Sequence, residues 1–377
     1  LVAEGRPVLG ALSESLRTFY RREDWGAYFL NVLVLMALSL VASLSGIAVF
    51  LTLPLSLVYL AFCQVDARAL EAAARALAAR HEALRTRFSS LPGGEPVQVV
   101  LREPLLPLEV VDAPEDAALE AVRSRDRARR FDLAHEPLMR LTLVQRSPGH
   151  AALLMTSHHI ITDGWCLGLL VGDLLRFYAA AREGKALAPE RSPSLGAYTR
   201  WLLERDTRAS LDHWKAYLAD YARPVGLARR EPPLAEREQR QYTLHLPAEL
   251  SARLRALAAT CRVTSSGLLQ VLWGLVLAHA ASTDDVAFGL VVSGRPAHLP
   301  QVEEMVGLFI NTLPVRLRLD RSASLRQVLQ AQQARALASE PHQHCSLAEV
   351  QALTPLRNTL LTHALVFENY PLDRAEI

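Results

Sequence analysis

The sequence predicts an α/β fold with mixed sheets, because short apolar stretches typical of strands alternate with longer stretches of helical periodicity in both halves of the chain. Half of the 377 residues are hydrophobic, and the formal net charge is +2. Such a chain folds around an apolar core, and its charge gives no reason to expect nucleic acid as a partner. The length exceeds that of one ordinary core, so we expect two subdomains.

The first half alternates helix, strand and turn signals. Asp66 is placed to cap a helix that ends near Ala79, since its carboxylate can accept hydrogen bonds from the free N–H groups of the first turn. Turn residues separate two apolar runs, 137–145 and 151–156, which we expect to pair as strands. The remaining predictions are a turn at 89–94, a strand at 97–101, a helix at 117–130 and a helix from Trp165 to about Ala181.

The second half repeats this alternation after a looser region that is rich in proline. Ser265 is expected to cap a helix at 267–281. The further predictions are short helices at 195–203 and 211–221, helices at 250–260 and 325–339, and strands at 286–292, 312–319 and 360–367.

The best candidate for chemistry lies where the second of the two paired strands ends, because two imidazoles, a carboxylate and a glycine follow it. A strand-to-helix turn suits catalysis, since the strand end fixes side chains and the helix presents free N–H groups. His159 is the candidate base, because an unperturbed imidazole titrates near pH ~6.5, close to cellular pH. The candidate catalytic set is His158, His159, Asp163 and Gly164, with Trp165 as support.

Asp163 has two interpretations. In the first, it caps the helix that begins at Trp165, and one histidine is an ordinary core residue. In the second, it fixes the loop by pairing with a buried arginine. Arg295 is the candidate partner, because it leaves an apolar strand, where an unpaired guanidinium is unfavourable. Such a pair would brace the histidine loop from the opposite subdomain, whereas the alternative for Arg295 is an exposed turn.

The motif His158-His159-x-x-x-Asp163-Gly164 resembles the HHxxxDG signature of the condensation domains of nonribosomal peptide synthetases, which belong to the chloramphenicol-acetyltransferase-like superfamily. Other segments resemble the same family in the same order, and the similarity covers about 66–373. These segments are Arg80–Phe88, Phe131–Leu133 with Pro137 and Leu138, Val292–Pro296 followed by Met305–Thr312, and Leu365–Pro371.

The resemblance implies an acyltransferase of antibiotic biosynthesis, with two chloramphenicol-acetyltransferase-like subdomains arranged around a central tunnel. Donor and acceptor peptidyl carrier proteins are expected at opposite ends of the tunnel, each with its substrate on a phosphopantetheine arm, and neighbouring synthetase domains are further partners. The acceptor amine attacks the donor thioester, with His159 beside the amine and N–H groups from Gly164 onward at the oxyanion. The domain itself is expected to bind no cofactor.

Three further residues receive roles from their position. Arg80 and Arg85 are either solvated charges at a helix end or, as the resemblance implies, structural support beneath the histidine motif. Asn369 ends a strand, where it either donates a hydrogen bond near the reacting centre or forms a turn.

Two rival functions stay open. A coenzyme-A-dependent acyltransferase of the same superfamily keeps His159 and Asp163 but has a different C-terminal motif from the sequence Phe367-Glu368-Asn369-Tyr370 found here. A non-catalytic recruitment module on the same fold usually loses part of the histidine motif, which is intact in this chain. Neither the donor nor the acceptor group is predicted.

The cysteines are scattered without metal-ligand spacing, so neither a metal site nor a disulfide framework is indicated. Cys166 follows the motif at a helix start and is an imaginable nucleophile, but the implied reaction needs no covalent enzyme intermediate. Reduced thiols predict a cytoplasmic protein. The four cysteines are Cys63, Cys166, Cys261 and Cys345.

The first 65 residues are atypical for the family, because no charged residue occurs from Trp25 to Val65. This stretch is long enough to cross a bilayer. Three interpretations are open, namely a membrane anchor, an unusually apolar first strand and helix packed within the domain or on a partner, and an artefact of the sequence. The expected division is an apolar segment at 1–65, a subdomain at 66–190 with the histidine motif, a crossover at 191–240, and a second, truncated subdomain at 241–377.

Overall fold

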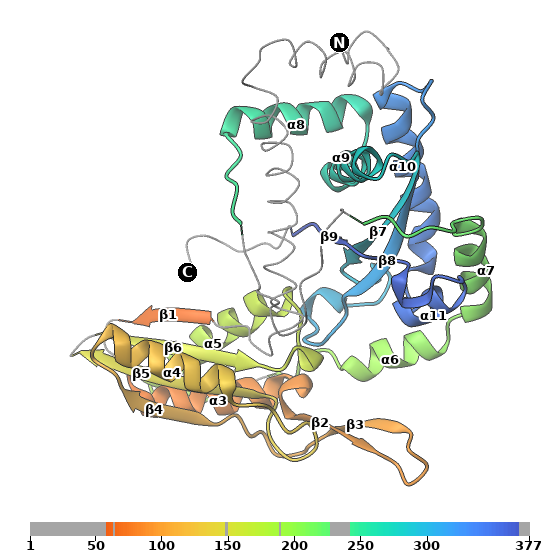
Figure 1. Ribbon diagram of the computed structural model, residues 1–377. Coiled ribbons are helices and arrows are strands. Elements are labelled where there is room, and N and C mark those ends of the chain that lie inside the picture. Colours follow the sequence, from red (N-terminus) through yellow and green to blue (C-terminus); the bar gives the residue numbers. More distant parts are fainter. Residues whose placement is uncertain (1–57, 63–64, 148–149, 188–189, 227–241, 369–377) are drawn as a thin grey trace. The chain divides into compact units, whose positions relative to one another are not determined.

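The computed structural model of the chain describes residues 58–62, 65–147, 150–187, 190–226 and 242–368 (Figure 1). Contacts divide the chain into two compact units. The described part of unit 2 comprises 58–62, 65–205 with its short gaps, 295–310 and 368, whereas unit 1 comprises 206–226, 242–294 and 311–367. The segment 295–310 therefore belongs to the unit that holds the histidine motif, although it follows the predicted boundary at 241.

Unit 2 is built on a four-stranded mixed sheet with the order β1-β6-β5-β4. The two strands predicted to pair before the motif do so, and Arg140 lies opposite Thr156 in their antiparallel register. β1 is antiparallel to β6, and β4 is parallel to β5. The strands are β1 (Val58–Phe62), β4 (Leu108–Asp112), β5 (Met139–Ser147) and β6 (His150–Ser157).

Both faces of this sheet are covered by helices (Figure 1). Successive residues of a strand point to opposite faces, so Leu143 and Leu153 join the core under α3 and α5. Val144 and Leu154 instead meet α4 on the other face. The helices are α3 (Ala67–Arg80), α4 (Asp116–Ala128) and α5 (Cys166–Arg182).

The other elements of unit 2 are short. β2 (Thr86–Ser90) and β3 (Pro96–Val100) form an antiparallel hairpin after the 3₁₀ turn η2 (Glu82–Arg85). α6 (Leu195–Leu203) packs through Leu195 and Tyr198 on a small apolar cluster with Phe309, near the 3₁₀ turn η5 (Val302–Glu304).

Unit 1 contains a three-stranded mixed sheet with the order β8-β7-β9. β7 is antiparallel to β8 and parallel to β9. Phe288, Trp273 and Leu329 are among the residues that form the core between this sheet and its helices. The elements are α7 (Thr207–Tyr217), α8 (Ala248–Cys261), α9 (Ser265–Ala280), β7 (Asp285–Val292), β8 (Asn311–Arg318), α10 (Leu325–Ser339), η6 (Glu340–His342), α11 (Leu347–Ala352), η7 (Arg357–Thr359) and β9 (Ala364–Val366).

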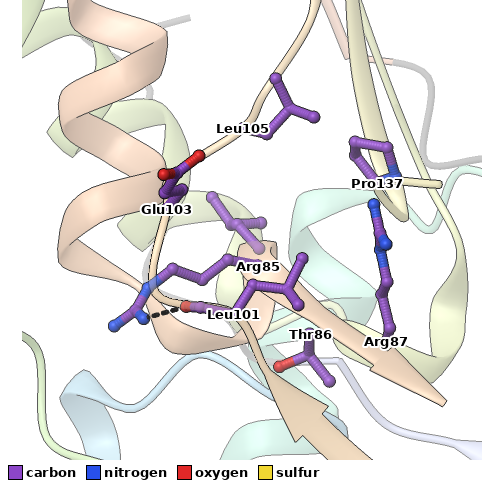
Figure 2. A pocket seen from close by; sticks show the side chains of 8 residues that line it. Arg85, Thr86, Arg87, Leu101, Glu103, Leu105 and Pro137 are labelled. Carbon is purple, nitrogen blue, oxygen red and sulfur yellow. Dashed lines mark hydrogen bonds between the residues drawn. The ribbon is translucent and has the colours of Figure 1, made fainter. Parts of the chain in front are cut away.

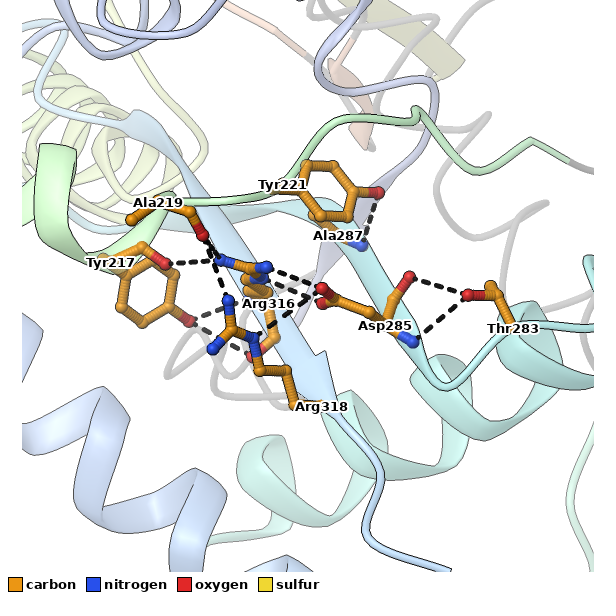
Figure 3. Close-up of polar contacts among 8 residues, drawn as sticks. All are labelled: Tyr217, Ala219, Tyr221, Thr283, Asp285, Ala287, Arg316 and Arg318. Atoms are coloured by element: carbon orange, nitrogen blue, oxygen red, sulfur yellow. Dashed lines mark hydrogen bonds and ion pairs between the residues drawn. The ribbon is translucent and has the colours of Figure 1, made fainter.

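A buried arginine ties this sheet to the end of α7 (Figure 3). The Arg316 guanidinium on β8 binds both carboxylate oxygens of Asp285 at 2.8 and 2.6 Å. It also donates to the carbonyls of Tyr217 and Ala219, at 3.2 and 2.5 Å. A buried cation is tolerated when its donors are paired in this way, so the network fixes α7 on the strand pair.

Helix caps explain the accuracy and the errors of several predicted boundaries. Asp66 caps α3 as predicted, with its carboxylate accepting from the N–H groups of the first turn. The predicted cap Ser265 is wrong, because the Thr264 hydroxyl accepts from the Gly267 N–H and Ser265 is already helical. The helix predicted at 211–221 lies at Thr207–Tyr217, because Asp206 caps it.

Two further predictions need correction, and two elements were not predicted. The predicted turn at 89–94 begins later, because β2 continues to Ser90. The strand predicted at 360–367 is only Ala364–Val366, since three residues pair with β7. β4 and α11 were not predicted, although Ser346 and Glu349 form a capping box that marks the start of α11.

The apolar stretch from Trp25 to Val65 lies mostly outside the described residues. Its described part includes β1, a strand that pairs with β6 from Val58↔Met155 to Phe62↔Ala151. Among the described helices, none is by itself long and apolar enough to cross a membrane, whereas α8 and α9 together, bent by 101° between them, reach that length and composition.

Candidate functional site

The histidine motif forms the connection between β6 and α5, as the sequence predicted. β6 ends at Ser157, His159–Ile161 form the 3₁₀ turn η3, and α5 begins at Cys166. The backbone N–H of His158 donates to the Leu138 carbonyl at 2.8 Å, so the motif starts from a fixed point beside β5. The turn therefore presents its side chains from the rigid end of a central strand.

A hydrogen bond to its imidazole fixes the His158 side chain in the turn. Its Nδ1 accepts a hydrogen bond from the Ile160 N–H at 3.1 Å, which makes His158 the cap of η3. A ring nitrogen that accepts carries no proton, so a neutral His158 has its proton on Nε2. Burial, and then the neighbouring charge of His159, lower the pKa of His158 below its ordinary value. His158 is therefore neutral near pH 7 and fixed in the turn.

His159 lies within η3 and is half-buried. Among the described residues, no hydrogen-bond partner is found for its imidazole, in contrast to that of His158. A candidate base must have a free nitrogen for the proton that it takes, and this geometry meets the requirement. Of the two adjacent histidines, the second thus keeps an imidazole whose two nitrogens have no hydrogen-bond partner in the described part of the chain.

Asp163 is a buried brace and not the cap of α5. Its side chain has no exposed surface, and Oδ1 lies 3.2 Å from Arg295 Nη2. Its Oδ2 accepts from the Phe309 N–H at 3.1 Å. The capping interpretation is therefore wrong, whereas the predicted pair with Arg295 is present.

Arg295 extends this brace to the loop that surrounds η5. Its guanidinium donates to the carbonyls of Val302 and Met305 at 2.7 and 2.9 Å and lies 3.9 Å above the Phe309 ring. The side chain is 4 % exposed, so the alternative of an exposed turn arginine is wrong. The predicted origin of Arg295 in the opposite subdomain is wrong, because both partners lie in unit 2 and the pair fixes the loop from within that unit.

Cys166 belongs to the same buried cluster. Its thiol lies 3.2 Å from Asp163 Oδ1 and 3.2 Å from the Gly307 carbonyl, and it is fully buried. Burial, and then the charge of Asp163, raise the pKa of this thiol to about 12. A thiol in this state is a poor nucleophile, so the structure argues against the nucleophilic alternative.

Gly164 is exposed at the start of the turn into α5, and the next residue, Trp165, donates through Nε1 to the Glu303 carbonyl at 3.0 Å. The N–H groups of Cys166 and Leu167 donate to the carbonyls of Asp163 and Gly164. These two N–H groups are therefore not available to an oxyanion. Of the N–H groups from Gly164 onward that were expected to stabilise the oxyanion, those at the exposed beginning of the turn remain.

Arg80 and Arg85 are mostly buried and bonded within unit 2, whereas the support beneath the histidine motif that the resemblance implied stays a prediction. Arg80 Nε binds Asp173 of α5 at 2.8 Å, and its Nη1 donates to the Glu190 carbonyl at 2.7 Å. Arg85 donates to the Leu101 carbonyl at 2.5 Å (Figure 2). The cavity beside Arg85 measures about 10 Å³, the space of a single water, so it is no substrate site. Asn369 lies outside the described residues.

Sequence reasoning assigned no role to two groups of side chains in unit 2. His81 is 1 % exposed, and its Nε2 lies 2.8 Å from Asp173 Oδ2. Burial opposes ionisation of Asp173, but hydrogen bonds from His81 and Arg176 hold its pKa well below the usual range. An aspartate among the leucines of α5 was the available signal. The family-like segment Phe131–Leu133 was the available signal for Phe131, whose ring meets that of His158 edge-on.

The described residues contain no cluster of three or more His, Cys, Asp or Glu side chains that could hold a metal ion. Within the same part of the chain, Cys166, Cys261 and Cys345 are free thiols. Among the described residues of the motif, the His159 imidazole has no hydrogen-bond partner and the backbone at Gly164 is exposed.

Comparisons with known proteins connect this geometry with one family. A family model described as the condensation domain matches residues 56–377. Bacitracin synthase 3 of Bacillus licheniformis is 38 % identical over 315 residues, which are 82 % of this chain and 5 % of that protein. Tyrocidine synthase 2 of Brevibacillus parabrevis is 34 % identical over 306 residues, 79 % of this chain and 8 % of that protein. The chain thus spans a small part of these relatives.

Solved structures show the same fold. The X-domain from teicoplanin biosynthesis has a TM-score of 0.67 and 25 % identity, and the match covers 82 % of this chain and 71 % of that one. The first condensation domain of the calcium-dependent antibiotic synthetase has a TM-score of 0.63, with 88 % of this chain and 79 % of that one covered. Its identity of 20 % makes it a likeness of fold alone.

Proposed function

This chain belongs to the condensation-domain family of nonribosomal peptide synthetases, and on that premise we propose that it is an acyltransferase that forms an amide bond. The family was predicted from the histidine motif and its companion segments, and the chloramphenicol-acetyltransferase-like α/β fold follows from it. One observation carries the proposal, namely the intact motif in which His158 and Asp163 are fixed by the protein while the His159 imidazole is open.

In the proposed reaction, the acceptor α-amine attacks the carbonyl carbon of the donor thioester. A C–N bond forms, the C–S bond breaks, and the thiol of the donor arm leaves. The amine nitrogen loses one proton, and the leaving thiolate gains one. An α-amine has a pKa near ~8 and is partly protonated at neutral pH, so a neighbouring base is needed to take its proton.

His159 is the residue proposed to take this proton, because its imidazole is half-buried and unpaired among the described residues. The Gly164 N–H, at the exposed start of the turn, is the proposed donor to the developing oxyanion. His158, Asp163 and Arg295 keep the turn in place and need no contact with substrate. Trp165 contributes by anchoring the turn to Glu303.

The partners of the reaction are donor and acceptor peptidyl carrier proteins, and neighbouring synthetase domains are included in the proposal. Each carrier brings its substrate on a phosphopantetheine arm, and the domain binds no cofactor of its own. Cytoplasmic location stays a prediction that rests on the expectation of reduced thiols.

Condensation between two carrier proteins loaded with aminoacyl thioesters, read by mass spectrometry, tests the proposal. We expect an amide product with wild type and a rate about 10²-fold lower with His159→Ala, because general acid–base catalysis contributes at least that much. His150→Ala is the matched control, since this histidine is exposed on β6 and lies outside the motif.

The outcomes separate the parts of the proposal. No product from folded wild type, across several substrate pairs, would contradict amide formation and favour the recruitment module. Product from coenzyme A thioesters in place of the loaded carriers would favour the coenzyme-A-dependent alternative. Equal rates for wild type and His159→Ala would leave amide formation intact but remove the role of His159.

A further inference from the structure

A buried ion pair lies beneath the histidine motif and has no part in the proposed chemistry. Arg140 on β5 binds Asp126 on α4 through Nε and Oδ1 at 2.6 Å, and both side chains are less than a tenth exposed. Arg140 Nη2 also donates to the carbonyls of Asp126 and Arg129 at 2.7 and 3.1 Å. Buried charges persist in a fold when they are paired and hydrogen-bonded, as the Nε and Nη2 groups of Arg140 are here.

Asp126 joins this pair to the strand that carries the motif. The Thr156 hydroxyl on β6 donates to Asp126 Oδ2 at 2.6 Å. Thr156 lies opposite Arg140 in the strand register and only two residues before His158. One carboxylate of α4 therefore holds β5 and β6 together where β6 approaches the motif, and Figure 1 shows α4 lying along these strands.

A ring carries the contact from Arg140 to His158. The Arg140 guanidinium lies 4.2 Å from the centroid of the Phe131 ring, in the position of a cation–π contact. The Phe131 ring meets the His158 imidazole edge-on, with centroids 6.0 Å apart and an angle of 80° between the planes. The Phe131 side chain thus lies between the ion pair and His158, and it contacts both Arg140 and His158.

His158 in turn sets the position of His159. Its Nδ1 accepts from the Ile160 N–H, and this bond closes the turn η3 on which His159 lies. A rotation of the His158 ring would remove the acceptor from Ile160 and release the turn. Contact with Phe131 on one side and with Ile160 on the other holds the ring in one orientation.

We propose that Asp126, Arg140 and Phe131 are positioning residues that hold His158 as the Nε2-protonated tautomer and thereby place His159 for proton transfer. None of the three needs to touch substrate. The inference deepens the proposed function and rests on it for the role of His159, whereas the orientation of His158 is a property of the fold and can be measured without substrate.

Phe131→Leu is the decisive variant, because it removes the ring and keeps the ion pair. Replacing Arg140 or Asp126 alone would leave its partner charged and buried, and such a variant is at risk of not folding. Phe131→Tyr restores the ring. Phe177→Leu is the matched control, since Phe177 also lies under an arginine, Arg176 at 4.6 Å, but on α5 in the buried core.

The first measurement is the ¹⁵N NMR spectrum of the histidine side chains in the full chain, with the His158 signals assigned through His158→Gln. We expect Nδ1 of His158 to be the unprotonated nitrogen in wild type, in Phe131→Tyr and in Phe177→Leu. In Phe131→Leu we expect its two nitrogen shifts to move toward each other, as the two tautomers mix.

The second measurement is the carrier-to-carrier condensation rate. We expect kcat to fall about 10-fold in Phe131→Leu with KM little changed, because misplacement of a catalytic group costs rate more than binding. Phe131→Tyr should recover the rate and Phe177→Leu should keep it.

An unchanged His158 tautomer in Phe131→Leu, or a changed tautomer with unchanged kcat, would overturn the positioning role. The proposed function fails separately, when folded wild type gives no amide product even though the NMR shifts behave as expected.

Discussion

The buried charge of Asp163 determines the role of this residue in the motif. Asp163 has no exposed side-chain surface, and Arg295, the Phe309 N–H and Cys166 surround its carboxylate. An aspartate with these partners is fully occupied and cannot orient an imidazole as in a catalytic triad. Asp163 therefore supports the site by fixing the conformation of the loop between His159 and α5.

Asp163→Asn tests this role. The amide keeps the shape of the side chain but leaves the Arg295 guanidinium buried without a counter-charge, which costs about 3–5 kcal/mol of unfolding free energy. Denaturant unfolding of the full chain measures the loss.

Asp116→Asn is the matched control for that substitution. Asp116 pairs with Arg146 but its side chain is 94 % exposed, and such surface pairs contribute about 1 kcal/mol or less. A loss for Asp163→Asn no larger than that of the control would contradict the brace.

At the scale of elements, a group of histidines joins α7 to η6 in unit 1. The His213 and His342 rings stack with centroids 4.2 Å apart and planes at 20°. His213 Nε2 lies 3.0 Å from the Ser339 hydroxyl, and the Ser210 hydroxyl lies 3.0 Å from His342 Nδ1. Two stacked imidazoles tolerate one positive charge poorly and two charges worse, so the packing of α7 depends on pH.

This contact predicts a decline in the stability of unit 1 below about pH 6.5. Burial, and then the charge of His342, lower the pKa of His213 from its ordinary value of 6.5. In acid the unfolded chain therefore takes up a proton that the folded chain resists, so unfolding becomes easier as the pH falls from 6.5 toward the lower folded value. Thermal unfolding at about pH 7.5 and pH 5.5 shows the difference.

His213→Asn measures how much of the loss of stability in acid comes from this contact, because the amide can still form a hydrogen bond with Ser339 but does not titrate. We expect a smaller drop in melting temperature between the two pH values than in wild type. His158 and His363 also have pKa values lowered, first by burial, and contribute with the same sign in both proteins. An equal drop in both proteins would assign the acid sensitivity to other groups.

At the scale of the whole molecule, each unit has a hydrophobic core of its own. Leu153 is fully buried between the unit 2 sheet and its helices, and Phe288 is fully buried in unit 1. A domain with its own core can unfold as a cooperative body. The units therefore are expected to respond separately to changes in their cores.

Leu153→Ala and Phe288→Ala examine this expectation by calorimetry of the full chain. The first should cost unit 2 about 2–5 kcal/mol and the second should cost unit 1 about 3–5 kcal/mol, through lost burial and the cavity left behind. Each substitution should lower one of two transitions. A single transition that both variants lower equally would show instead that the units unfold together.

Local patterns let the sequence determine much of this protein. Apolar periodicity located the paired strands β5 and β6 and the helix α5, and the cap at Asp66 fixed the start of α3. The motif identified the family, and the isolated charge of Arg295 after an apolar strand predicted its pair with Asp163. Each of these signals lies within a few residues, or in the energetic cost of burying one charge.

Only the tertiary structure showed what fixes His158 and that the His159 imidazole has no hydrogen-bond partner among the described residues. Thr156 and Asp126 lie 30 residues apart in the chain, and the edge contact of Phe131 with His158 follows no repeat of the chain. β4 was missed because its pairing with β5 depends on the whole sheet. Side-chain contacts between distant segments depend on how the elements pack, and spacing along the chain does not encode that packing.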